Sequence, residues 1–410
     1  MHYDAVVVGL GPAGAHFSYI ASKLGHNIVA LERGSTHGAK TCAGGISPVS
    51  AKILNEQYKR IPSEVVERDI EGVSLETKTN TCRLGIPNVE AFTTRRANFD
   101  HWLINETIEK GTTVEENCRI KKIDFSQSCV NIMIRKKGSI RNISTDCVVG
   151  AYGAGSTIPR IIKLPTLETA IGIQCEMELP AEAIGRAIGN NLSFFYDSRF
   201  SSQGYAWIFP RKDSIAVGLL DDTPTKLSER LRSFIDVYHL AKRFRVAAWG
   251  RTRNKAALLP NEISPLTYRD RLLLIGDAAG FGDRITWEGI PYALRSADFA
   301  VKTFCLAHDR NDFSIEVMKQ YEETWKSSFE KDLRYGKKLQ KTMFDKDLDN
   351  NWSTVINLLN ENKNLREFLI HEMQKHMSIA RSLAKLPVKE KLLLLKHFGY
   401  KTKSLMFSKS

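Results

Sequence analysis

A glycine-rich turn close to the N-terminus constrains the fold of this chain more than any other feature. The apolar run 3–8 is typical of a buried strand, and residues 12–24 are typical of a helix. The turn between them fits GxGxxG, and a further apolar run at 27–31 completes a strand–helix–strand unit. This arrangement predicts a parallel α/β sheet that binds the diphosphate of a dinucleotide at the start of the first helix.

The residues of the turn have separate physical roles in such a site. The first two glycines allow a tight turn and the close approach of a pyrophosphate, and the third lets the helix pack on the strand. The helix start supplies unpaired N–H groups for the phosphates. The turn residues that we expect to contact the cofactor are Gly9, Gly11, Pro12, Ala13 and Gly14.

An acidic residue closes the second strand. Glu32 follows Gly9 by 23 residues, where a carboxylate is expected to accept hydrogen bonds from ribose hydroxyls. Arg33 beside it and Arg119, at the start of a later strand, are expected to contact the same cofactor. The plain alternative is a glycine-rich turn with a surface glutamate, and the flanking strand and helix argue against it.

Composition and length limit the class of protein. The chain has 410 residues, 42% hydrophobic and 26% charged, which is typical of a globular protein with two domains and an appendage. No run of 18 apolar residues occurs, and a strand that begins at residue 3 leaves no room for a signal peptide. Seven cysteines without a CxxC pair argue against a disulfide framework or a metal site. We therefore expect a cytoplasmic protein.

Positive charge is concentrated near the C-terminus. The net charge is +13, and residues 331–410 hold 17 Lys and Arg against 8 Asp and Glu. Such a balance is typical of proteins that meet nucleic acid, an anionic membrane or an acidic protein. No recognition module for nucleic acid is present, so nucleic acid is not expected as a partner.

Residues 389–398 combine a block of leucines with flanking lysines. An amphipathic helix of this kind can lie in the membrane interface, so we expect peripheral contact at the inner face of the membrane. A terminal helix packed on its own domain is an equal alternative. The same basic surface could also receive an acidic, ferredoxin-like electron donor.

Apolar patterns indicate two kinds of sheet. A helix is expected at 98–110, a three-stranded meander at 119–125, 130–135 and 140–145, and a buried strand at 148–151. The stretch 167–259 alternates and is rich in aromatics. It predicts a second, mostly antiparallel sheet with strands at 169–177, 192–196, 205–209 and 215–219. A buried strand at 272–275 and a helix at 289–308 return to the first sheet, and helices are expected after residue 313.

Two features favour FAD over NAD as the dinucleotide. The nucleotide-binding domain resumes about 260 residues after its first motif, and the run Gly276-Asp277-Ala278-Ala279-Gly280 resembles the second flavin motif of p-hydroxybenzoate-hydroxylase-like flavoproteins. The resemblance implies that Asp277 bonds the ribityl chain and that the helix near Gly289 points its N-terminus at the isoalloxazine. An Arg-x-x-Phe-Asp pattern begins at Arg96. The further residues that the resemblance places on FAD are Arg96, Gly276, Asp277, Gly289 and Ile290.

We therefore predict an α/β fold in which a Rossmann-like FAD-binding domain is interrupted by an antiparallel β-sheet substrate domain. A helical, basic C-terminal region follows. The expected segments of the FAD-binding domain are 1–60, 95–165 and 265–330. Those of the substrate domain are 61–94 and 166–264, and the C-terminal region is 331–410.

Two more motifs narrow the resemblance. Tyr205-Ala206-Trp207-Ile208-Phe209-Pro210, with Gly218 downstream, fits Y-x-W-x-F-P, and Thr41-Cys42-Ala43-Gly44-Gly45 places a cysteine in the loop after the ribose acid. With the nucleotide motifs, these resemble the geranylgeranyl reductase family over roughly residues 3–330. The resemblance implies reduction of C=C bonds in a polyprenyl lipid or a prenyl-quinone chain. The loop residues implied to contact FAD are Thr41, Cys42, Gly44 and Gly45.

The aromatic motif suits such a substrate. Alternation on a strand puts Tyr205, Trp207 and Phe209 on one face, and a floppy apolar chain needs an apolar tunnel. An ordinary sheet core is the alternative for all three. The residues expected to bind substrate are Tyr205, Trp207, Phe209, Pro210, Gly218 and Trp287.

An isolated C=C bond needs a proton as well as a hydride from reduced flavin. A thiol keeps its proton at neutral pH, the more so in an apolar pocket, so Cys42 can serve as general acid. The family resemblance implies this role for a cysteine at that place. The alternative for a lone cysteine is a small buried apolar side chain.

The chain departs from the family pattern after its second flavin motif, where Arg284 and Trp287 replace smaller residues. Two other functions therefore stay open: a hydroxylase or halogenase-like monooxygenase on the same fold, and a non-catalytic FAD-binding protein at the membrane. No second GxGxxG occurs, so NADPH as electron donor could bind only transiently.

Overall fold

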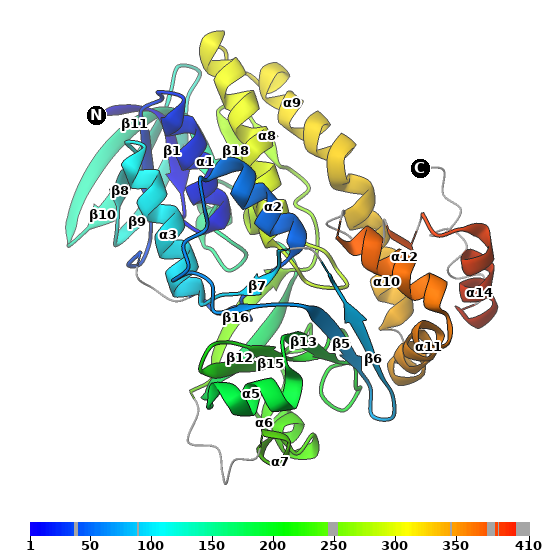
Figure 1. The fold of residues 1–410 in the computed structure, drawn as a ribbon. Helices are drawn as coiled ribbons and strands as arrows, with labels where there is room; N and C mark the ends of the chain where they lie inside the picture. The colour runs from blue at the N-terminus through cyan, green and yellow to red at the C-terminus, as the bar shows by residue number, and fades with distance from the viewer. Residues whose placement is uncertain are drawn as a thin grey trace.

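The computed structural model describes residues 1–36, 40–87, 90–244, 253–344, 347–374, 382–383 and 385–398. It has three parts: a helix-covered sheet at the top of Figure 1, a second sheet below it, and C-terminal helices beside both. The α/β fold with an antiparallel sheet and a helical C-terminal region is the fold expected from the sequence.

The first sheet has eight strands in the order β17-β18-β11-β1-β2-β8, with β10 and β9 continuing from β11. Five consecutive strands of it are parallel: β18 (Leu272–Leu274), β11 (Ser139–Gly150), β1 (His2–Val8), β2 (Ile28–Leu31) and β8 (Thr113–Glu115). The remaining strands pair antiparallel: β17 (Tyr268–Arg269), β9 (Cys118–Phe125) and β10 (Val130–Lys136). Strands distant in sequence therefore meet at the centre of the sheet, because β1 pairs with β11 and β11 with β18.

One expectation about this sheet was wrong. The third meander strand and the buried strand at 148–151 are a single strand, β11. Its first half pairs with β10 in the hairpin and is largely exposed, whereas its last residues lie between β1 and β18 and are fully buried. The change of burial along one strand produced two different apolar patterns.

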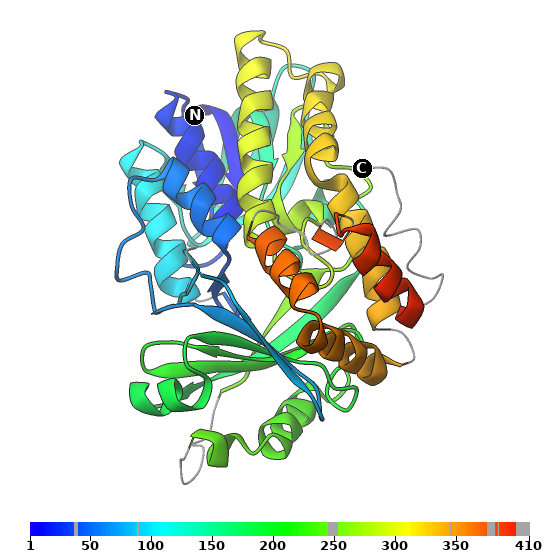
Figure 2. The same ribbon diagram turned by 45° about the vertical axis from the view of Figure 1, so that its right-hand side comes forward.

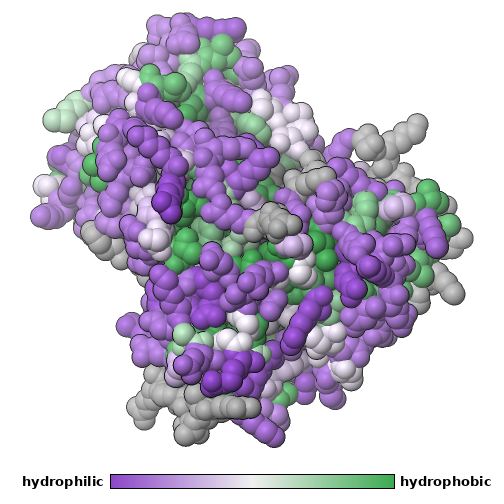
Figure 3. Space-filling model, in the orientation of Figure 1, coloured by the Kyte–Doolittle hydropathy of each residue, from purple (hydrophilic) through white to green (hydrophobic). Residues whose placement is uncertain are grey.

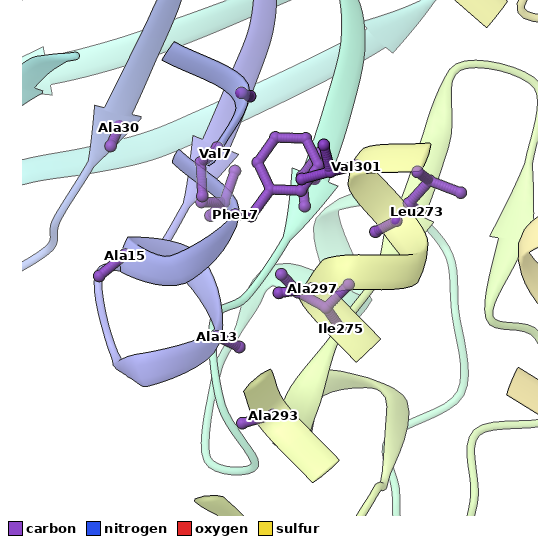
Figure 4. Packing of buried hydrophobic residues seen from close by; sticks show 14 of the residues in the cluster. Val7, Ala13, Ala15, Phe17, Ala30, Leu273, Ile275, Ala293, Ala297 and Val301 are labelled. Atoms are coloured by element: carbon purple, nitrogen blue, oxygen red, sulfur yellow. The ribbon is translucent and has the colours of Figure 1, made fainter. Parts of the chain in front are cut away.

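Helices cover the sheet. Those of the first domain are α1 (Pro12–Lys23), α2 (Pro48–Gln57), α3 (Arg96–Glu109), α4 (Ile158–Ile161) and α8 (Ile290–Asp309). Figure 4 shows how α1 and α8 pack, with Phe17 and Val301 meeting between them and Ala13 facing Ala293 near their starts. Small residues at this contact allow the starts of the two helices to approach closely, so both cofactor motifs lie at one end of the sheet.

The second sheet has seven strands in the order β16-β12-β15-β14-β13-β5-β6. Only β13 and β5 pair parallel. Its strands are β5 (Gly72–Glu76), β6 (Thr81–Gly85), β12 (Thr169–Glu178), β13 (Asn191–Phe195), β14 (Ala206–Pro210), β15 (Ser214–Asp221) and β16 (Lys255–Pro260). A small sheet joins it to the first domain through β3 (Gly45–Ile46), β4 (Arg68–Asp69) and β7 (Phe92–Thr93).

The sequence reading missed three helices beneath this sheet: α5 (Ala181–Ile188), α6 (Leu227–Val237) and α7 (Leu240–Phe244). They cover the face opposite the first domain (Figure 1). Leu227, Leu231 and Phe234 of α6 pack with Ile208 and Val217 of the sheet. One face of the sheet is thus a closed core, and the other faces the first domain.

The C-terminal region packs on the rest of the chain. Its helices are α10 (Lys331–Met343), α11 (Leu348–Glu361), α12 (Lys363–Met373) and α14 (Val388–Phe398). A π-helical turn, η2 (Lys326–Glu330), joins α10 to α9 (Ile315–Trp325), whose buried residues belong to the core of the first domain. Figure 2 shows α11 and α12 beside the β5–β6 hairpin. Residues 399–410 of the predicted basic tail lie outside the described residues, as do the side chains of 395–398.

Within the described part of the chain, no helix combines the length and the apolar character that a membrane span requires.

Candidate active site

One cavity of about 430 Å³ connects the three parts of the molecule. It begins at the N-terminus of α1, passes the loop at residues 40–48, crosses the upper face of the second sheet and ends among α10, α11, α12 and α14. Figure 3 shows hydrophobic residues in the hollow between the upper domain and the lower sheet, while most of the visible surface is hydrophilic. A long, apolar molecule fits the shape and chemistry of this space.

The glycine turn has the geometry of a phosphate cradle. Gly9 has φ +101°, and a Cβ on it would lie 2.5 Å from the Ala151 carbonyl oxygen. A Cβ on Gly14 would lie 2.0 Å from the Gly9 carbonyl oxygen, so both must be glycine. Gly11 differs, because nothing lies within 4 Å of its Cβ position, and no side chain caps the N-terminus of α1 that it begins. Open space in front of uncapped N–H groups fits a diphosphate.

The expected ribose acid lies beside this turn. Glu32 accepts hydrogen bonds from the N–H groups of Leu10 (3.1 Å) and Gly34 (3.0 Å), so its carboxylate is fixed next to the glycine turn. Arg33 and Arg119 are both exposed and outside the cavity lining. Arg119 follows Cys118, whose N–H bonds the Glu32 carbonyl oxygen. A contact of either arginine with FAD stays a prediction.

The second motif forms the opposite side of the cradle. Strand β18 leads into a 3-10 turn, η1 (Gly276–Ala279), which begins with Gly276 at φ +59°. Asp277 lines the cavity, and its carboxylate pairs with Lys40 at 3.3 Å. Gly289 is the N-cap of α8, which has no side-chain cap, so a second helix start opens on the same cavity. Ile290, the first residue of α8, also lines it.

The loop that carries Cys42 is held by hydrogen bonds to the carbonyls of the cysteine and of the two residues after it. Gln174 donates to the Cys42 carbonyl (3.0 Å), Arg211 to that of Ala43 (3.5 Å), and the Thr94 N–H to that of Gly44 (2.8 Å). These three donors come from three different strands or loops. Thr41, Cys42, Gly44 and Gly45 all line the cavity. Cys42 is therefore a fixed, partly exposed thiol inside an apolar space.

A buried arginine lies beside this thiol. Arg96, at the start of α3, forms two hydrogen bonds of 2.8 Å with Asp100 and a further one with the Cys42 sulfur. Burial works against its charge, but Asp100 and Cys42 together raise the pKa of Arg96 above its usual value. The expectation of purely apolar surroundings for Cys42 was therefore incomplete. A permanent positive charge at this point stabilises negative charge on the sulfur.

The aromatic motif faces the cavity. Tyr205, Trp207 and Phe209 share the upper face of the sheet and line the cavity. A Cβ on Gly218 would lie 2.2 Å from the Trp207 ring, so this glycine makes room for the indole rather than lining the cavity. Pro210 ends β14, and its carbonyl accepts a hydrogen bond from the Thr93 hydroxyl of β7. Substrate contact at these residues stays a prediction.

Comparison with known proteins decides the family. The family model described as an FAD binding domain matches residues 2–281. The chain belongs to the FAD-binding domain family. FAD is therefore its cofactor, as the sequence predicted, and the cradle just described fits it.

Relatives of this FAD-binding protein include reductases. It is 27% identical to the digeranylgeranylglycerophospholipid reductase of Methanococcus vannielii, over 88% of this chain and 91% of that protein. A second such reductase, from Methanocaldococcus jannaschii, is also 27% identical, over 85% of this chain and 89% of that protein. These comparisons confirm the resemblance to geranylgeranyl reductases and the expectation of an FAD-dependent reductase.

Solved structures share the fold. A geranylgeranyl bacteriochlorophyll reductase-like protein from Thermoplasma acidophilum superposes with a TM-score of 0.79, at 20% identity over 98% of each chain. A flavin-dependent brominase superposes with a TM-score of 0.74, at 16% identity over 92% of this chain and 94% of that one. At these identities the likeness shows the fold alone.

The sequence reading missed the C-terminal wall of the cavity in this FAD-binding protein. Tyr196 stacks on Trp352 of α11 with ring centroids 3.4 Å apart. Apolar side chains of the C-terminal helices close the far end of the cavity: Leu339, Met343, Leu358, Leu359, Leu365, Leu369 and Leu394. The leucine spacing in 356–369 could have indicated a helix with an inward face, but not what that face covers.

The loop at residues 283–288 is the most unusual part of the FAD-binding protein's cavity. Arg284 is 2% exposed and donates to the carbonyls of Pro260 and Gly280, and burial lowers its pKa to about 10. Trp287 has φ +55° and lies among the apolar residues of the cavity wall. Both departures from the family pattern therefore shape the cavity, and neither is exposed on the surface.

Among the described residues, one group could hold a metal ion: Asp4, His26 and His308. The group is half-buried and lies outside the cavity lining. Burial, with the neighbouring His308, lowers the pKa of His26. The sequence reading, which considered only cysteine motifs, gave no sign of this group.

Proposed function

We propose that this chain saturates C=C bonds of a polyprenyl lipid, of the geranylgeranyl kind or in a prenyl-quinone chain. The observation that carries the proposal is the single cavity, which joins the FAD cradle, the fixed thiol and the aromatic wall to an apolar far end. The names of the curated relatives support the same substrate class. An apolar tunnel of this kind suits a substrate with few polar groups.

The residues of the chain divide the work. When bound, FAD supplies the hydride that the C=C bond accepts. Cys42 gives the proton from its sulfur to the other carbon, and the Arg96 guanidinium stabilises the charge that remains on the sulfur. Tyr205, Trp207 and Phe209 hold the chain and exclude water from the reacting bond.

The test is a mass spectrum of geranylgeranyl lipids after anaerobic incubation with the dithionite-reduced protein. Each reduced bond adds two hydrogen atoms, so we expect a ladder of products spaced by that mass. No shift from a protein that binds FAD would contradict the proposal and favour the non-catalytic alternative.

The likeness of fold to a flavin-dependent brominase keeps a monooxygenase as the second candidate. Substrate-dependent oxygen consumption coupled to NADPH would favour it. The reductase proposal leaves the electron donor as NADPH or a ferredoxin-like protein. Supplying each donor in place of dithionite in the anaerobic mass-spectrometry assay identifies which one supports lipid reduction.

We also propose that the C-terminal region contacts the inner face of the membrane, where such lipids lie. Val388 and Leu392 of α14 are 64% and 56% exposed, and Leu394 of the same helix reaches the cavity. An exposed apolar pair beside the cavity wall, on a basic segment, suits an interfacial helix.

Replacing Val388 and Leu392 together by glutamate should weaken binding to anionic phospholipid vesicles by about 10-fold or more, because apolar burial is lost and negative charge is added. Co-sedimentation measures the change. Ile315→Glu on α9 is the matched control, since Ile315 is 43% exposed and lies on another helix. Equal binding by the double variant and the control would rule out this docking surface.

A further inference from the structure

Three side chains that can bind a metal meet at the end of the first domain that is remote from the FAD cradle: Asp4, His26 and His308. Asp4 lies in β1, His26 in the loop between α1 and β2, and His308 in the last turn of α8. Helix α8 starts at the cradle and reaches the top of the molecule in Figure 1. At a rise of about 1.5 Å per residue, His308 lies about 28 Å from Gly289. The proposed reaction gives these three residues no role.

The spacing of the three side chains suits ligands around a common ion. One ligand atom of each residue lies within 4.8 Å of the other two. His26 Nδ1 is 3.7 Å from one Asp4 carboxylate oxygen, and His308 Nε2 is 3.8 Å from the other. Both separations exceed the roughly 2.7–3.2 Å of an N–H···O hydrogen bond. Zinc binds nitrogen and oxygen at about 2.0–2.1 Å, which places two tetrahedral ligands about 3.4 Å apart, so small side-chain rotations complete the site.

Two histidine–aspartate pairs elsewhere in the chain have a different geometry. His2 Nε2 lies 3.1 Å from Asp146, and His16 Nε2 lies 3.0 Å from Asp298. Both are direct hydrogen bonds, and neither leaves room for an ion between the two groups. The wider separations around Asp4 therefore distinguish this group from an ordinary pairing of histidine with aspartate.

Neighbouring groups hold two of the three ligands in position. The Asn27 N–H donates to the Asp4 carboxylate (2.8 Å), and the Asp4 N–H donates to the Asn27 carbonyl (3.0 Å). His26 Nε2 is 3.4 Å from the Cys305 sulfur, which shares a face of α8 with His308 three residues later. When Nε2 donates its proton to this sulfur, Nδ1 is left with the free lone pair that a metal ligand requires.

We propose that Asp4, His26 and His308 bind a zinc ion that fastens the end of α8 to the first sheet. Two imidazoles and one carboxylate form a donor set that suits zinc. The three side chains are 26%, 12% and 36% exposed, so water reaches the group and fills the fourth position. The ion connects three segments that are distant in the sequence. Its binding therefore stabilises the folded domain, and its role is structural.

Calorimetric titration with zinc chloride tests the site in FAD-loaded protein from which a chelator has removed metals. We expect one zinc ion per chain. His308→Ala removes the most exposed ligand, so the variant should fold normally and bind zinc about 100-fold more weakly. Asp4→Asn keeps the size of the side chain but removes its charge, and we expect a similar loss. His2→Ala is the matched control, since His2 lies on the same strand but in a directly hydrogen-bonded pair, and its zinc affinity should be unchanged.

Thermal unfolding provides a second readout, because it shows whether the ion stabilises the fold. Excess zinc should raise the melting temperature of the wild type and of His2→Ala by about 3 °C or more. The melting temperatures of His308→Ala and Asp4→Asn should not respond to zinc. A wild-type melting temperature that does not change with zinc would overturn the fastening role.

The titration has two outcomes that would overturn the site itself. Absence of zinc binding by the wild type would mean that His26 and His308 only pack with Phe304 as an aromatic cluster. Equal affinity in the wild type, His308→Ala and Asp4→Asn would mean that zinc binds other groups. Either result leaves the proposed function intact, because lipid reduction is assigned to the cavity, whose lining does not include these residues.

Discussion

Replacing Cys42 by alanine is expected to lower the rate of C=C reduction by about 10²–10⁴-fold while FAD stays bound. The reason is chemical: the Arg96–Asp100 pair remains, but the cavity loses the thiol that gives its proton to carbon. Product formation by mass spectrometry measures the rate, and flavin absorbance of the purified protein measures binding. The Cys42 loop is fixed through main-chain carbonyls, so its shape should survive the change.

Cys129→Ser is the matched control for this variant. Cys129 is a partly exposed free thiol like Cys42, but it lies in the β9–β10 hairpin, far along the sheet from the cavity lining. We expect normal turnover from it. Normal turnover from Cys42→Ala as well would remove this thiol from the mechanism.

Gly11→Val should lower the affinity for FAD by about 100-fold, or about 2.7 kcal/mol, with little effect on the fold. Gly11 has φ −70°, which any residue adopts, and its Cβ position has no neighbour within 4 Å. The protein therefore tolerates a side chain there, but the side chain fills the space in front of the α1 N–H groups. Fluorescence titration of apoprotein with FAD measures affinity, and urea unfolding measures stability.

Gly185→Ala provides the comparison. Gly185 also has open space around its Cβ position, but it lies in α5 beneath the second sheet. Alanine there should leave FAD affinity unchanged and stabilise the protein by up to about 1 kcal/mol, because alanine favours the helix. An unchanged FAD affinity in Gly11→Val would show that the diphosphate does not lie at this turn.

The elements with strong local signals were predictable from the sequence. The strand, turn and helix at residues 2–23 lie where the apolar run and the glycines place them. The aromatic face of β14 follows directly from alternation on a strand. Such features depend on residues that are close in the sequence, so the local apolar pattern is enough to predict them.

Features that depend on distant partners were not predictable. Arg96 reads as a helix-start arginine, and nothing in its neighbourhood says that it meets Cys42 across 54 residues. The sequence around Glu288 gives no sign that its carboxylate accepts a hydrogen bond from Ser50 of α2. The leucines of 389–398, in α14, suggested a membrane helix or a packed one, and only the tertiary structure shows that Leu394 lines the cavity.

The order of strands in the first sheet also affects how the chain folds during its synthesis. The central strand β1 has neighbours from residues 28–31 and 144–150, and β11 pairs in turn with residues 272–274. Contacts between residues this far apart in the sequence form slowly, because a long loop must close before the contact stabilises the fold. The second helix start of the FAD cradle, at Gly289, leaves the ribosome later still. The FAD cradle is therefore incomplete until residue 289 has been made, and until then the early strands are exposed to aggregation.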